Sequence, residues 1–111
     1  LRSYLRAEEY MQTHMDEVSD LVVKNLDLKK ETVDSFVLSP HMKYDTDPYT
    51  KSVKKMWEKM ANFGYLTAGN INLDDHMNHT IYQRALESLI ADYPNSRFFK
   101  DKQEQFKANN L

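Results

Sequence analysis

Cysteine is absent from the sequence, and glycine occurs only twice, as Gly64 and Gly69. Without cysteine the chain has no disulfide, no thiolate nucleophile and no cysteine-ligated zinc. Two glycines are too few for phosphate-binding loops and Rossmann turns, which need glycine where the backbone bends or approaches a ligand closely. These absences disfavour disulfide scaffolds and nucleotide-binding folds.

An excess of one charge is also missing, since 15 basic residues stand against 17 acidic ones and the net charge is −2. Nucleic-acid binding needs a basic surface, so we expect no nucleic-acid partner. The lysines at 29–30 and 51–59 are interpreted as solvated helix faces. No apolar run approaches the roughly twenty residues of a membrane-spanning helix, and LRSYLRAEEY lacks the apolar core of a signal peptide.

The length of 111 residues suits one hydrophobic core, so we expect a single helical domain over residues 1–111 with no internal boundary. The first residue is Leu rather than Met. We therefore expect the sequence to be a fragment of a longer chain or a processed product.

One segment, residues 45–66, carries complete signals for a helix and reads DTDPYTKSVKKMWEKMANFGYL. An oxygen of Asp45, Thr46 or Asp47 can cap the first free N–H groups, and Pro48 is tolerated in a first turn, so the predicted start is about Asp47. Gly64 ends the helix in a left-handed conformation. Apolar residues at helical spacing predict a buried face: Tyr49, Val53, Met56, Trp57, Met60 and Phe63.

The same spacing predicts further helices and no strand, so the expected fold is all-α with five or six short-to-medium helices. One helix covers about residues 1–13, a second is capped by Thr13, and a third spans 29–37 before Ser39-Pro40 ends it. A single turn is expected at 74–77, a helix capped by Asn78 or Thr80 follows it, and the last helix covers about 96–107. The residues predicted to be buried on these helices are Val18, Leu21, Val22, Leu26, Val33, Phe36, Val37, Ile81, Tyr82, Ala85, Leu86, Leu89, Ile90, Phe98, Phe99 and Phe106.

The densest group of titratable residues is Asp74-Asp75-His76-Met77-Asn78-His79. A metal site needs ligands that converge from at least two elements, and an HxxH spacing without the HExxH pattern is a weak signal. We interpret this segment as a polar helix start, and expect no metal ligand, cofactor-binding residue or catalytic residue in the chain.

Two carboxylate pairs and two isolated histidines have simpler interpretations. Asp16 with Glu17, and Asp45 with Asp47, lie where a helix N-terminus favours negative charge. His14 and His41 have no companions and are expected to be solvated at loops or helix ends.

Methionine and tryptophan repeat at helical spacing as Met56, Trp57 and Met60. We expect this stripe to be core, with a soft groove for a partner helix as the alternative.

Several segments in order carry a resemblance: AEEYMQTHMDE, LDLKKET, LSP, then FGYL, INLDDH and YQRAL. Together they resemble the C-terminal section of bacterial ABC-importer substrate-binding proteins of the nitrate, sulfonate, taurine and thiamine-precursor group. The resemblance covers nearly the whole chain. It implies the closing helical section of a two-lobed α/β receptor, whose ligand cleft lies mostly upstream of Leu1.

The resemblance further implies a non-catalytic receptor that is periplasmic or lipid-anchored at the outer face of the membrane. It would bind a small nutrient through the missing lobes and hand it to an ABC permease. Without those lobes the fragment is expected to expose an apolar surface and to self-associate. Two alternatives stay open: a free-standing helical interaction module, and a fragment of a pyrimidine-forming enzyme in which His76 and His79 would matter.

Overall fold

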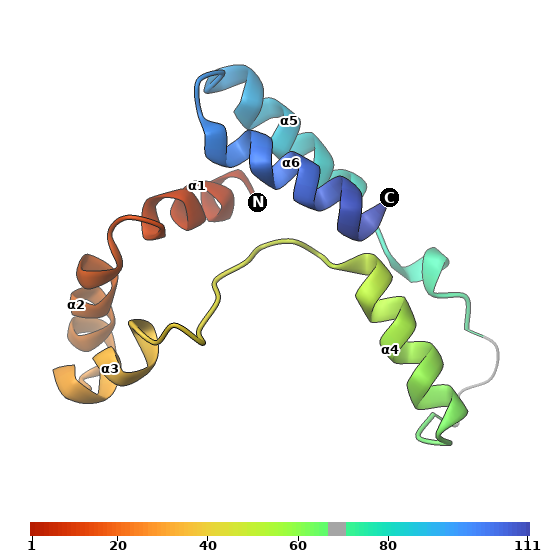
Figure 1. The fold of residues 1–111 in the computed structure, drawn as a ribbon, viewed down its shortest axis with the longest axis horizontal. Helices are drawn as coiled ribbons and strands as arrows, with labels where there is room; N and C mark the ends of the chain where they lie inside the picture. The colour runs from red at the N-terminus through yellow and green to blue at the C-terminus, as the bar shows by residue number, and fades with distance from the viewer. Residues whose placement is uncertain (67–70) are drawn as a thin grey trace. The chain divides into compact units, whose positions relative to one another are not determined.

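The structure is a computed structural model that describes residues 1–66 and 71–111. Within this part of the chain it is entirely helical, which confirms the all-α prediction (Figure 1). The elements are α1 (Arg2–Met11), α2 (Met15–Leu26), α3 (Lys30–Val37), α4 (Thr50–Asn62), the short 3-10 helix η1 (Leu73–His76), α5 (Thr80–Asp92) and α6 (Arg97–Asn110).

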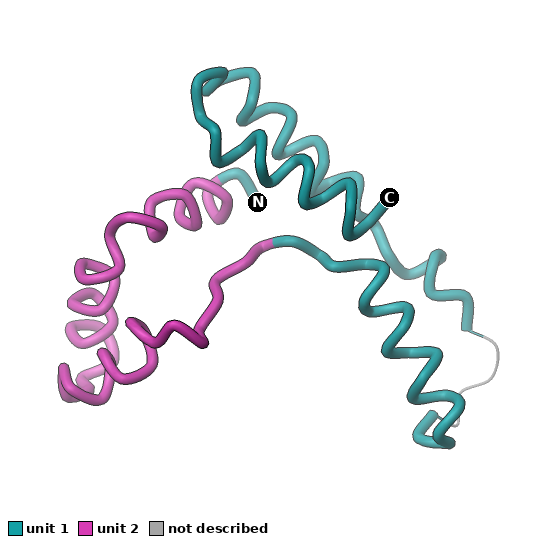
Figure 2. The backbone as a smooth tube through the Cα atoms, viewed as in Figure 1, with its two compact units in different colours: residues 1–2, 47–111 teal, residues 3–46 magenta. Residues whose placement is uncertain are grey.

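The chain divides into two compact units (Figure 2). One unit holds residues 3–46, with most of α1 and all of α2 and α3. The other holds residues 1–2 and 47–111, with α4, η1, α5 and α6. A single domain over residues 1–111 stays a prediction.

In the unit of residues 3–46, α2 packs against α3. Val33 and Val37 of α3 are buried as predicted, and Phe36 is half-buried. Leu21 and Leu26 were predicted to be buried, but they are 55% and 61% exposed. Leu21 lies on the side of α2 opposite Ser19, which contacts α3, so Leu21 faces solvent, and Leu26 is the last residue of the helix.

A polar cluster joins α2 to α3. The buried hydroxyl of Ser19 on α2 donates to the Asp34 carboxylate on α3. The Lys30 ammonium lies 3.0 Å from the same Asp34 oxygen, 3.1 Å from the Ser19 hydroxyl and 2.8 Å from an Asp20 oxygen. The hydroxyl, the ammonium and the carboxylates therefore satisfy one another by hydrogen bonds and opposite charges. The cluster holds α2 and α3 in a defined relative position.

This cluster makes stability depend on pH. The Ser19 hydroxyl, and after it the Lys30 ammonium, hold the pKa of Asp34 below its usual 3.8. A carboxyl with a lowered pKa stabilises the folded state above the unfolded pKa, and that stabilisation is lost as the pH falls below it. We expect acidification from about pH 5 to about pH 2.5 to lower the melting temperature of the parent protein more than that of Asp34→Asn. Thermal unfolding followed by circular dichroism measures this, and parallel losses in the two proteins would contradict it.

A second long-range contact within this unit involves Glu8, which is only 3% exposed. Its carboxylate accepts hydrogen bonds from the Thr46 backbone N–H at 3.0 Å and from the Thr46 hydroxyl at 2.6 Å. This contact holds the end of the connection after α3 against α1. A buried carboxylate needs such donors, because burial without them is costly.

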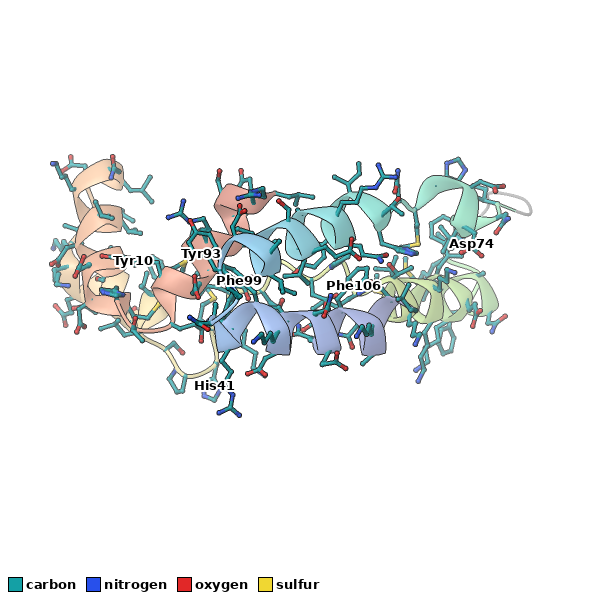
Figure 3. The ribbon with its side chains drawn as sticks, turned by 90° about the horizontal axis from the view of Figure 1, so that it is seen from above. Tyr10, His41, Asp74, Tyr93, Phe99 and Phe106 are labelled. Carbon is teal, nitrogen blue, oxygen red and sulfur yellow. The ribbon has the colours of Figure 1, made fainter. Side chains whose placement is uncertain are left out.

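The other unit is built on the pairing of α5 with α6. Ser96 caps α6 by accepting a hydrogen bond from the Phe99 N–H, a role that serine fills well. Phe99 and Phe106 of α6 lie between the two helices (Figure 3). The Phe106 ring stacks on Tyr82 of α5 with centroids 5.3 Å apart. The predicted core residues Tyr82, Leu86, Leu89, Phe99 and Phe106 are all buried, whereas Ile81 is exposed.

The first turn of α4 is held by the last turn of α6. The Asn110 side-chain oxygen accepts a hydrogen bond from the Thr50 N–H at 2.8 Å, and its amide donates to Asp47 at 2.8 Å and to the Phe106 carbonyl at 2.9 Å. Asp47, Thr50 and Asn110 are all buried. The cap of α4 therefore comes from a residue sixty positions away.

Three predicted caps differ from those observed. Asp47 accepts from the Tyr49 N–H, and Tyr49 turns left-handed, so α4 begins at Thr50 rather than at about Asp47. Thr13 does not cap α2, because its hydroxyl lies against the His14 ring. Asn78 satisfies the Thr80 N–H at 3.1 Å, although His79 occupies the cap position of α5.

Candidate functional site

The candidate site is the uncovered apolar side of α4. Met56 is 57% exposed and Met60 37%, while Phe63 and Tyr65 beyond the helix end are 74% and 76% exposed. Only Thr50 of this helix is buried. We refer to Met56, Met60, Phe63 and Tyr65 as the α4 docking face.

The position of α4 in its unit explains this exposure. Its first turn meets the C-terminal end of α6, and the rest of the helix runs away from α5 and α6 (Figure 1). Lys51 donates to the Ala108 carbonyl at 2.9 Å and Lys54 pairs with Asp74, so contacts with its own unit lie on one side. Trp57 was predicted to be core, but it is only half-buried. The apolar stripe was predicted correctly, whereas its burial was predicted wrongly, because among the described residues of its own unit α4 packs only on the end of α6.

Gly64 shapes the aromatic end of the docking face. It adopts φ +75°, its N–H donates to the Ala61 carbonyl at 3.0 Å, and the Tyr65 N–H donates to the Met60 carbonyl at 3.0 Å. These two bonds form a Schellman motif, in which a left-handed residue closes the helix. The turn brings the Tyr65 ring to 6.4 Å from that of Phe63. The predicted glycine stop is confirmed.

Replacing Gly64 with alanine should lower the free energy of unfolding by about 1–2 kcal/mol, the cost of a left-handed conformation for a residue with a Cβ. No atom lies within 4 Å of the added Cβ, so strain in the backbone is the whole effect. Chemical denaturation measures it. Gly64→Asn, which tolerates this conformation, should lose less, and equal losses would contradict the assignment.

The side chains of the acidic and histidine-rich segment, residues 74–79, do not converge on one site. Asp74 pairs with Lys54 and receives the Asn72 cap at its N–H, while Asp75 and His76 are exposed. Among the described residues, no three His, Asp or Glu side chains are grouped so that they could hold a metal ion. Asp74 is labelled in Figure 3 at the η1 end of its unit.

His79 differs from its neighbours because its ring packs on Phe106, with centroids 5.8 Å apart. Its Nδ1 atom is buried and has no hydrogen-bond partner in the described part of the chain. A catalytic histidine is normally oriented by a hydrogen bond from its second nitrogen to a carboxylate or carbonyl. The observed environment of His79 is that of a packing residue.

A hollow of about 530 Å³ lies along α1 and the turn after it, lined by Ser3, Arg6, Ala7, Glu9, Tyr10, Thr13 and His14. The Tyr10 and His14 rings stack with centroids 3.9 Å apart, and Tyr10 donates to Glu17. That hydrogen bond raises the pKa of Tyr10 above its usual value. Because its walls come from one helix and one turn, the hollow cannot enclose a ligand as binding pockets do.

The remaining candidates lie where their simpler interpretations place them. Asp16 and Glu17 are in the first turn of α2. His41, labelled in Figure 3, is exposed in the connection after α3.

Comparisons of the chain with protein-family models, with curated proteins and with solved structures find no match. In the described residues, no helix is long and apolar enough to cross a membrane.

Proposed function

We propose that this chain works by binding rather than by catalysis, and that it is the C-terminal helical section of an ABC-importer solute receptor. The observation that carries the proposal is the α4 docking face, whose large apolar side chains are exposed on an otherwise well-capped helix. Exposed apolar patches of this kind mark surfaces that another molecule covers. In a receptor, the rest of the two-lobed fold would cover this face.

The ligand in this proposal is a small nutrient such as nitrate, a sulfonate, taurine or a pyrimidine, and the partner is an ABC permease at the membrane. The support is the sequence resemblance from AEEYMQTHMDE to YQRAL. The nutrient-binding cleft would lie upstream, in lobes facing the periplasm or the outer face of the membrane.

Sequencing of the reading frame upstream of Leu1 and of the neighbouring genes tests the receptor proposal. We expect a βα pattern of the length of two lobes, behind a signal peptide and beside permease and ATPase genes. A start codon immediately before Leu1 would contradict it.

A free-standing interaction module is the second candidate, and the same exposed face favours it. Here a separate protein would cover the α4 docking face. The two candidates differ in whether the covering segment belongs to the same polypeptide, which the upstream sequence also decides.

Self-association of the isolated chain is expected in either case, because apolar side chains exposed on two copies can bury each other. Light scattering at high protein concentration should show species larger than a monomer, and Met56→Ser/Met60→Ser/Phe63→Ser should restore the monomer. A parent protein that stays monomeric would contradict self-association through the α4 docking face.

A further inference from the structure

The charge beside the α4 docking face identifies what kind of partner fits it. The helix carries four lysines and one glutamate, at positions 51, 54, 55, 59 and 58. Lys51 and Lys54 are already engaged by Ala108 and Asp74. Lys55 and Lys59 are exposed, and neither makes an ion pair with any residue that the structure describes.

The two available lysines are placed regularly. They are four residues apart, so their side chains are neighbours on the helix surface, with Cβ atoms about 6 Å apart. Phe63 continues the same row four residues further on, and Met56 with Met60 form the adjacent row. Positive charge therefore borders the exposed apolar strip along one flank, over two turns.

We propose that the α4 docking face binds an acidic amphipathic helix, with apolar residues packed on Met56 and Met60 and carboxylates one turn apart beside Lys55 and Lys59. This inference rests on the docking face proposed above. In a receptor the acidic helix would belong to the missing part of the chain, and in an interaction module it would belong to another protein. Methionine suits such a contact because its flexible, polarisable side chain adapts to the surface it meets.

An anionic bilayer fits the same face less well. A helix that adsorbs to a membrane lies flat, with its apolar side buried and cations on its polar face. Here Lys54 is tied to Asp74, and Val53 and Trp57 on the other flank are half-buried. The exposed apolar strip of α4 is therefore narrow, and Lys55 and Lys59 border it on one flank only. Such a strip suits contact with one partner helix better than contact with a flat bilayer.

The test uses two labelled peptides of about eighteen residues, long enough to form an isolated helix. Both carry leucines at helical spacing, and the positions flanking the leucines are glutamate in one peptide and lysine in the other. Fluorescence anisotropy with the whole chain should show about tenfold tighter binding of the glutamate peptide, the effect of two surface ion pairs.

Three variants test the site. Lys55→Glu/Lys59→Glu should reverse the preference between the peptides, whereas Lys24→Glu/Lys29→Glu, an exposed pair away from α4 with the same change of charge, should leave it intact. Met56→Ser/Met60→Ser should weaken both peptides about tenfold or more, since two buried methionines are lost from the contact. Circular dichroism checks that each variant is folded.

Equal affinity for both peptides, or a preference unchanged in the lysine variant, would overturn the acidic-helix proposal. So would binding to vesicles of phosphatidylcholine and phosphatidylserine without binding to either peptide. If Met56→Ser/Met60→Ser weakens both peptides but neither is preferred, the docking face stands and only its charge preference fails. If the methionine variant binds both peptides as the parent does, the docking face itself fails.

Discussion

Phe106→Ala is expected to lower the free energy of unfolding by about 3–5 kcal/mol, the usual cost of removing a buried phenylalanine from a core. The ring is 1% exposed and lies between α5 and α6, in contact with Tyr82 and His79. Its removal leaves a cavity that helices in a pair this small cannot easily close. Urea denaturation measures the loss.

Ile81→Ala is the matched control for Phe106→Ala. Ile81 is on the partner helix α5 but 59% exposed, so its truncation should cost less than about 1 kcal/mol. A cost for Phe106→Ala within the range of this control would show that α5 and α6 do not pack as described.

Asn110→Ala is expected to cost about 2–4 kcal/mol, because it leaves the Thr50 N–H without an acceptor and removes a donor from the buried Asp47 carboxylate. Besides lowering the free energy of unfolding of the whole chain, Asn110→Ala should loosen the first turn of α4. Amide hydrogen exchange should speed up in the first turn of α4 more than in α5, since α4 loses its cap while the α5–α6 core is unchanged.

The neighbouring Asn109 provides the comparison for this network. Among the residues that the structure describes, its amide donates to Asp47 alone, at 3.2 Å, and the residue is half-buried. Asn109→Ala should therefore cost about 1 kcal/mol or less. Equal effects of the two alanine variants, or exchange in α4 that is unchanged in Asn110→Ala, would contradict the proposed anchoring of α4.

Local sequence patterns predicted the helices well, because helical spacing, caps and breakers act over a few residues. Gly64 is an example, since it ends α4 at the predicted place. The apolar period likewise identified Phe99 and Phe106 as core. These features depend on chemistry within one or two turns.

Contacts between distant residues could not be predicted in this way. The hydrogen bonds from Thr50 to Asn110 and from Thr46 to Glu8 join residues 60 and 38 positions apart, and no local pattern marks them. The exposure of Met56 has the same origin. A periodic sequence shows which side of a helix is apolar, but only the fold shows whether a partner covers that side.

Methionine oxidation tests the central claim, that another polypeptide segment covers the α4 docking face. The chain would be treated with peroxide in isolation and within the protein purified in its native form from its source, and oxidation of each methionine measured by mass spectrometry. Met42, 46% exposed in the unit of residues 3–46, serves as the internal reference. We expect Met56 and Met60 to be about fivefold or more protected in the native protein relative to Met42, because buried thioethers react slowly. Met56 and Met60 that oxidise equally fast in both samples would contradict the claim.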